Sequence, residues 1–298
     1  MSNNSSRKND EAPLCPPPPS GSLRIVMIGD IVGKPGMRVA SSAVPYLRGA
    51  VGANAIVANA ENAADGSGLR CKDYRKLVDA GIDAITLGDH VFRKREIMLV
   101  LEKEDNIVRP ANLSPDAPGK RHVTIQIDGR DSIAIMCALG RVFMNPADCP
   151  FRAIDRCLSE VSPRTKIRLV DFHAEATSDM QLMGRYLDGR ATAVLGTHTH
   201  VPTADECVLP GGTGFQCDVG MTGPHESILG RKIEAVRDAT LNSVPMPFQV
   251  ATRDVRVSCT WFDADRETGK CLQIGRLQIS EDTIDAYDSA RAADNTLL

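Results

Sequence analysis

The sequence predicts a layered α/β protein with mixed sheets, and three observations lead to that class. Short apolar runs of strand length alternate with longer amphipathic runs through most of the chain, which is typical of a sheet covered by helices. An Asp-Gly turn divides residues 122–140 into two apolar runs, and such a turn favours an antiparallel hairpin. Two more β-like runs come late in the chain. We therefore expect a mixed sheet or a sandwich instead of a purely parallel sheet.

The expected elements follow one another in a regular order. In the first half, apolar runs predict strands at residues 23–29, 54–60 and 83–88, and amphipathic runs predict helices at 36–50, 72–81 and 94–104. In the second half, the hairpin at 122–140 is followed by a helix at 151–161, a strand at 166–172, a helix at 179–189 and a strand at 191–196. The late strands are expected at 256–264 and 271–279. Gly81 closes the second helix, as glycine commonly does. The chain shows no internal repeat.

The two ends of the chain differ in composition from its centre. Residues 1–21 are polar and then proline-rich, which predicts a disordered N-terminal arm. Residues 22–280 are expected to form the folded domain, and the small, polar residues 281–298 a flexible C-terminal tail.

The charge and the cysteine content limit the classes of partner and the cellular location that the sequence predicts. The 35 Lys and Arg residues nearly balance the 38 Asp and Glu residues, giving a net charge of -3, which argues against a nucleic-acid coat or an anionic membrane as partner. The nine cysteines are irregularly spaced and none forms a CxxC pair, so reduced thiols are expected. No apolar run reaches the roughly 18 residues of a membrane span. A soluble, cytoplasmic protein with chemistry at a local site is predicted.

Side chains able to bind metal follow five of the predicted strands. Because open α/β sheets bind ligands beyond the carboxyl ends of their strands, these positions define one candidate site. The candidate metal ligands are Asp30, Glu61, Asn62, Asp89, His173, His198 and His200, and His90 adjoins them in the sequence.

Each position also has a purely structural interpretation. An Asp after a strand commonly caps a turn or a helix, which would account for Asp30. A single His173 would fit a hydrogen-bonded interior imidazole. Glu61 is harder to explain in this way, since a buried carboxylate needs a partner. A shared metal site accounts for all five strand ends together.

The number of candidate ligands predicts two ions, because one tetrahedral ion takes only about four. Glu61 is the expected bridge between ions about 3.5–4 Å apart, and a water held between them would lose a proton near neutral pH. In an extended segment the imidazoles of His198 and His200 point to opposite sides, so each can bind a different ion. Oxygen and nitrogen ligands suit iron, manganese or zinc, and iron or manganese is preferred here.

His90 directly follows Asp89, and two neighbours on a tight loop seldom both face one ion. We therefore predict that His90 is the general acid, which protonates the departing oxygen of a phosphate ester. A histidine that only hydrogen-bonds to the ligands is the alternative.

Five segments together resemble the calcineurin-like metallophosphoesterases, and in detail their YmdB-like branch: GDIVG, NAENAADG, LGDH, DFHAEATSD and GTHTHVPTAD. The resemblance covers essentially the whole predicted domain. It implies a four-layer α/β/β/α sandwich, a di-iron or mixed di-metal centre, and phosphodiesterase activity towards 2′,3′-cyclic nucleotides. It also implies that Asp30, Glu61, Asn62, His173, His198 and His200 bind the metals, with Glu61 bridging, and that His90 donates the proton. One position departs: the branch usually has Asn in a GNH motif, where Asp89 adds a negative charge.

The sequence thus predicts a binuclear metallophosphoesterase that hydrolyses small phosphodiesters and uses two divalent ions as cofactors. No stable nucleic-acid partner and no membrane are expected, and self-association into a homo-oligomer stays open. Two other functions also stay open: a metal-containing regulatory or RNA-associated protein with weak catalysis, and a metal-dependent hydrolase of carbon substrates. Against the latter, amidohydrolases tend to carry a His-x-His pair after their first strand, whereas here the pair comes late.

Overall fold

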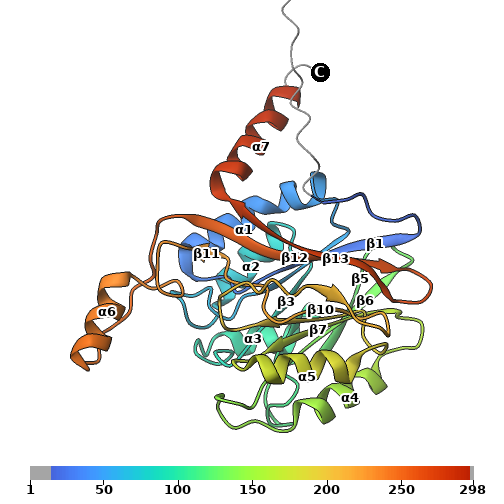
Figure 1. The fold of residues 1–298 in the computed structure, drawn as a ribbon, viewed down its shortest axis with the longest axis horizontal. Helices are drawn as coiled ribbons and strands as arrows, with labels where there is room; N and C mark the ends of the chain where they lie inside the picture. The colour runs from blue at the N-terminus through green and yellow to red at the C-terminus, as the bar shows by residue number, and fades with distance from the viewer. Residues whose placement is uncertain (1–14, 296–298) are drawn as a thin grey trace, which may run out of the picture.

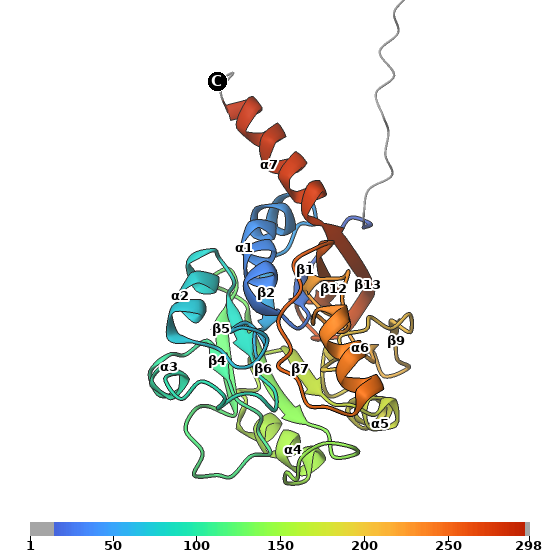
Figure 2. The same cartoon turned by 90° about the vertical axis from the view of Figure 1, so that its left-hand side faces the viewer.

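Two mixed sheets lie face to face between two layers of helices in the computed structural model, which describes residues 15–295 (Figures 1 and 2). The predicted four-layer α/β/β/α sandwich is thereby confirmed. Alternating strands and helices produce this arrangement because the central strands, such as β1 (Ser22–Ile28) and β6 (Ser132–Leu139), are buried on both faces and must be covered twice, by a helix layer and by the other sheet.

The first sheet has seven strands, ordered β11-β12-β1-β2-β3-β4, with β13 paired to β12. Strands β1 to β4 are parallel, whereas β12 runs antiparallel to β1 and to β13. The late strands expected from the sequence therefore extend the first sheet as its antiparallel part. The bounds are β1 (Ser22–Ile28), β2 (Ala55–Asn59), β3 (Ala84–Thr86), β4 (Ile107–Val108), β11 (Gly223–Pro224), β12 (Val255–Asp265) and β13 (Cys271–Ser280).

The second sheet has six strands, ordered β5-β6-β7-β8-β10-β9. The predicted hairpin is confirmed as the antiparallel pair β5 and β6, and β6, β7, β8 and β10 are parallel. The bounds are β5 (His122–Gln126), β6 (Ser132–Leu139), β7 (Ile167–His173), β8 (Ala193–Thr197), β9 (Cys207–Val208) and β10 (Gly214–Gln216). The short strands β4, β9, β10 and β11 are not predicted, because two or three residues carry no readable period.

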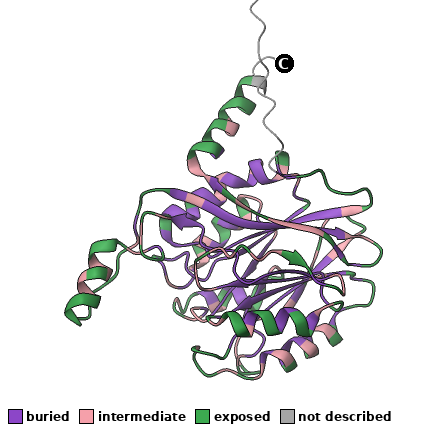
Figure 3. Cartoon of the chain, in the orientation of Figure 1, coloured by how far each residue is buried: buried purple, intermediate pink, exposed green. Residues whose placement is uncertain are grey.

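Three apolar layers hold the sandwich together (Figure 3). The first sheet packs against α1 (Gly33–Gly49), α2 (Cys71–Asp79) and α3 (Ile97–Lys103), and the second against α4 (Pro150–Glu160) and α5 (Thr177–Leu187). Between the sheets, Ile25, Val57, Ile135, Leu169 and Phe262 are among the fully buried side chains. This central layer fixes the strand ends of the two sheets relative to each other.

Two helices occupy segments where none is predicted. Helix α7 (Glu281–Asn295) replaces the expected flexible tail, because the apolar side chains of Ile284 and Tyr287 fall on one helix face. Ile284 is buried, and the ring of Tyr287 meets Tyr46 edge-on at 5.0 Å. Helix α6 (Ile233–Asn242) has no buried residue and projects from the body (Figure 1).

The predicted N-terminal arm falls mostly outside the described residues, which begin at Cys15. Cys15 itself is buried, and its sulfur lies 3.0 Å from Nη1 of Arg24. Arg24 also forms a buried ion pair with Asp263 (2.7 Å) and donates to the carbonyl of Pro16. All nine cysteines lie in the described part and are free thiols. No helix among residues 15–295 is long and apolar enough to cross a membrane.

Candidate metal centre

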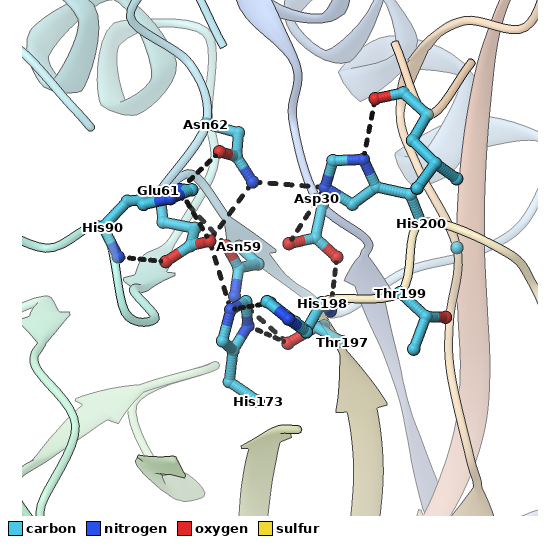
Figure 4. Close-up of polar contacts among 12 residues, drawn as sticks. Asp30, Asn59, Glu61, Asn62, His90, His173, Thr197, His198, Thr199 and His200 are labelled. Carbon is cyan, nitrogen blue, oxygen red and sulfur yellow. Dashed lines mark hydrogen bonds and ion pairs between the residues drawn. The ribbon is translucent and has the colours of Figure 1, made fainter. Parts of the chain in front are cut away.

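The predicted ligands come together at the carboxyl ends of parallel strands from both sheets (Figure 4). The first sheet contributes Asp30 beyond β1, Glu61 and Asn62 beyond β2, and Asp89 and His90 beyond β3; the second contributes His173 at the end of β7, and His198 and His200 beyond β8. The site therefore spans the two sheets, and it forms only when the sandwich is assembled.

Four of the candidate residues form a compact group that could hold a metal ion. The ligand atoms of Glu61, Asp89, His173 and His198 all lie within 4.8 Å of one another. Nε2 of His173 is 3.1 Å from Oε1 of Glu61 and 3.3 Å from Oδ1 of Asp89. Nδ1 of His198 is 3.0 Å from the same His173 nitrogen. These atoms point at a common centre, as ligands of one ion do.

A second group lies on the other side of Glu61. Nε2 of His200 is 3.9 Å from Oδ1 of Asp30 and 3.2 Å from Nδ2 of Asn62. That Oδ1 is buried and has no hydrogen-bond partner among the described residues, which is costly for a carboxylate unless a cation completes it. Asn62 Nδ2 also donates to Oε1 of Glu61 at 3.2 Å, so this amide connects the second group to the compact group. The donor set of both groups therefore fits divalent ions.

The side chain of Asn62 turns its amide nitrogen, not its oxygen, towards this second group. Its Oδ1 accepts a hydrogen bond from Nδ1 of His90 at 2.9 Å, while Nδ2 faces Glu61 and His200. An amide side chain ligates a metal through its oxygen, so ligation by Asn62 would require a flip of the terminal amide.

His90 lies at the mouth of the site, where it contacts the ligands without joining either group. Its backbone N–H donates to Oε2 of Glu61 at 2.9 Å, and its Nε2 is 3.7 Å from Oδ2 of Asp89. The side chain is 26% exposed. Of the neighbours Asp89 and His90, only Asp89 enters the compact group, as the sequence argument expects.

The buried charges of the compact group are balanced by a proton on an imidazole. Burial alone would lower the pKa of His173, but Glu61 and Asp89 hold it well above its usual value. Burial likewise opposes ionisation of Glu61, yet His173 and His90 hold its pKa well below the usual value. A metal ion here would displace the His173 proton, since ligands bind in their deprotonated forms.

The loop that carries His198 and His200 is a strained turn, so the extended backbone expected from the sequence is wrong. Their φ angles are 105° and 65°, in the left-handed region that non-glycine residues rarely adopt. Two buried carboxylates hold this turn. The N–H of His198 donates to Asp30 Oδ2 at 3.0 Å, and the N–H and hydroxyl of Thr199 both donate to Oδ2 of Asp218 at 2.9 Å.

A buried polar network beneath the site is absent from the sequence prediction. The carboxylate of Asp171 accepts hydrogen bonds from Asn59 (3.0 Å), Thr86 (2.5 Å) and Thr197 (2.7 Å). Burial raises the pKa of Asp171 to about 6. Nδ1 of His173 lies 2.8 Å from the same Thr197 hydroxyl. The sequence does contain a sign of this network: Asp171 stands between the apolar residues Val170 and Phe172 of β7, and an ionisable residue in such a place needs hydrogen-bond partners.

The fold and the cluster define a class: an enzyme of the metallophosphoesterase type, built on two sheets that meet at a carboxylate and imidazole site. The chain belongs to the YmdB-like protein family, whose profile matches residues 26–277. It is 42% identical over 260 residues to the 2′,3′-cyclic-nucleotide 2′-phosphodiesterase of Bacillus subtilis, covering 87% of this chain and 98% of that protein. A putative phosphatase/phosphodiesterase of Mycoplasma genitalium is 32% identical, with 87% and 93% covered.

Two solved structures share the fold over nearly the same span. A hypothetical protein from Thermus thermophilus superposes with a TM-score of 0.81 at 41% identity, covering 87% of this chain and all of that one. A novel phosphatase from Mycoplasma pneumoniae also superposes with a TM-score of 0.81, at 29% identity, with 87% and 94% covered. The hydrolase class predicted from the sequence is therefore confirmed.

Proposed function

We propose that this protein is a binuclear metal-dependent phosphodiesterase. The observation that carries the proposal is the arrangement of candidate ligands in two neighbouring groups, which the Asn62 amide connects at Glu61. One group would be Asp89, His173 and His198, and the other Asp30, Asn62 and His200. A carboxylate reached from both sides is the bridge that a two-ion site needs.

The bound ions would polarise the phosphoryl oxygens and supply a bridging hydroxide nucleophile at neutral pH. The protein's own residues would provide the rest. His90 would donate a proton to the leaving oxygen, because its ring is partly exposed and belongs to neither ligand group. The hydrogen bond from its Nδ1 to Asn62 orients the ring and leaves Nε2, which lies 3.7 Å from Oδ2 of Asp89, as the nitrogen that would donate the proton.

Iron or manganese is the proposed metal, and zinc also fits the donor set. The ligands are carboxylate, amide and imidazole, and no cysteine belongs to the cluster found among the described residues. Such oxygen and imidazole ligands favour iron, manganese or zinc over soft ions such as Cu(I), which thiolate ligands select.

The proposed substrates are small phosphodiesters of the 2′,3′-cyclic nucleotide class, which the name of the Bacillus subtilis relative suggests. In such a ring, the oxygen of a hydroxide would form a new bond to phosphorus, and the bond between phosphorus and one ribose oxygen would break, leaving a phosphate monoester on the other ribose oxygen. The released ribose oxygen then takes the proton from His90. The near-neutral charge favours a small substrate over stable nucleic-acid binding, and the free thiols fit a cytoplasmic protein.

The proposal is tested with bis-p-nitrophenyl phosphate and protein purified without chelators. Glu61→Gln and His200→Ala should each abolish metal-dependent hydrolysis. His122→Ala is the matched control, because His122 is also partly buried but lies outside the cluster, and it should keep normal turnover. Undiminished turnover in both site variants would falsify the proposal.

A further inference from the structure

We propose that Glu175 is a positioning residue that fixes the tautomer of His198, so that Nδ1 of this imidazole faces the metal centre with a free lone pair. The inference rests on the metal centre of the proposed function, and it adds a residue outside both ligand groups.

The two ring nitrogens of His198 face different surroundings. Nδ1 points into the compact group, 3.0 Å from Nε2 of His173 and 3.6 Å from Oδ1 of Asp89. Nε2 points the other way and lies 3.1 Å from Oε2 of Glu175. The imidazole ring of His198 therefore lies between the compact group and Glu175, with one ring nitrogen facing each.

The chemistry of the partner decides which nitrogen carries the hydrogen. A neutral imidazole has one N–H donor and one acceptor nitrogen, and an ionised carboxylate can only accept. Glu175 therefore places the hydrogen of His198 on Nε2 and leaves Nδ1 unprotonated. A carboxylate behind a ligating imidazole also orients the ring and raises its basicity.

The other two imidazoles, those of His173 and His200, need their hydrogen on Nδ1 so that Nε2 can bind metal. Neighbouring acceptors already place it there. Nδ1 of His200 faces the carbonyl oxygen of Leu229 at 3.2 Å, so it carries the hydrogen. Nδ1 of His173 faces the hydroxyl of Thr197, whose own hydrogen is directed to Asp171. Both rings would therefore ligate through Nε2. His198 must ligate through Nδ1 and needs an acceptor behind Nε2, which Glu175 supplies.

The position of Glu175 suits a clean test. It follows His173 by two residues, in the short link between β7 and α5, and its side chain is 50% exposed. Truncation of a half-exposed side chain leaves no core cavity, so a change in metal binding can be separated from a loss of folding.

The first measurement is a calorimetric titration of Mn²⁺ into the full-length protein after chelator treatment. The wild type should bind two ions, and Glu175→Ala should weaken the ion on the His198 side about 10–100-fold, the usual effect of removing such a partner. Glu175→Gln should fall between them, because the amide oxygen can still accept. The matched control is Glu160→Ala: Glu160 is 41% exposed and lies 3.6 Å from His122, outside the cluster.

The second measurement reads the tautomer directly in metal-free protein by ¹⁵N NMR of the histidine rings, with a His198 variant to assign the signal. Wild-type His198 should carry its hydrogen on Nε2, and Glu175→Ala should reduce the population of that tautomer, the remainder being held by the His173 nitrogen that lies 3.0 Å from Nδ1. Unchanged Mn²⁺ affinity and an unchanged tautomer in Glu175→Ala overturn the inference. If the wild type binds none of Mn²⁺, Fe²⁺ and Zn²⁺, the proposed function fails, and the NMR result still decides the role of Glu175.

Discussion

The backbone N–H of His198 donates a 3.0 Å hydrogen bond to Oδ2 of Asp30, which joins the end of β8 in the second sheet to the end of β1 in the first. The other oxygen of the same carboxylate is the buried atom that has no hydrogen-bond partner among the described residues. One side chain thus supports the histidine turn with one oxygen and offers the other to a cation.

Because the two oxygens of Asp30 have different roles, two substitutions of this residue should have different outcomes. Asp30→Asn can keep an acceptor for His198 but loses the charge, so the fold should persist while metal affinity falls at least about 100-fold. Asp30→Ala should lose metal and also destabilise the turn. Metal content and urea denaturation of both variants separate the two effects. Equal metal content in Asp30→Asn and wild type would argue against a ligand role.

Gly88 should tolerate no side chain, because a methyl group there would overlap Oε2 of Glu61 and Nε2 of His173. Gly88→Ala is therefore expected to remove bound metal and activity together. Gly129→Ala is the control: its methyl would meet open space, and its positive φ should cost only about 1–2 kcal/mol of stability. Elemental analysis checks both variants, and normal metal content in Gly88→Ala would show that the compact group is not where metal binds.

Asp218 should act mainly as a neutral support of the histidine turn. Burial, and after it the charge of Asp30, raises the pKa of Asp218 well above its usual value. Asp218→Asn keeps one acceptor oxygen but turns its NH2 towards a donor of Thr199 or Gly220, so it should cost less stability than Asp218→Ala. Asp218→Ala leaves the buried donors of Thr199 and Gly220 unpaired, at about 1–3 kcal/mol for each. Urea denaturation compares the two. Equal destabilisation by Asn and Ala would contradict the neutral role.

The buried thiols should make the protein less stable at alkaline pH. Burial raises the pKa of Cys259 and Cys271 from 9.0 to about 12 in the folded state. Above about pH 9 the unfolded state loses these protons and the folded state keeps them, so stability is full below that pH and falls towards pH 12. The fall is at most about 1.4 kcal/mol per pH unit for each thiol.

Urea denaturation at pH 8 and pH 10 under reducing conditions measures this slope. Cys259→Ala should lower stability at both pH values but reduce the difference between them by about 1 kcal/mol. Cys207→Ala, at an exposed position, should change that difference less. A difference that is unaffected by Cys259→Ala would contradict the account.

The layered fold and the ligand positions could be predicted because both depend on local pattern. Asp30, Glu61 and His173 each follow an apolar strand, and strand ends of parallel sheets converge. The left-handed backbone of His198 could not be predicted, since it is held by the hydrogen bond that its N–H donates to Asp30, which is far away in the sequence. Helix α7 also depends on a distant contact, between Tyr287 and Tyr46.

The central claim, that distant side chains converge on a pair of cations, is tested most directly by anomalous diffraction from crystals of protein purified without chelators. The account predicts two peaks about 3.5–4 Å apart on either side of Glu61, one near Asp30 and His200 and the other near His173 and His198. Crystals of active protein that show no peak at Glu61, or only one at another place, would contradict it.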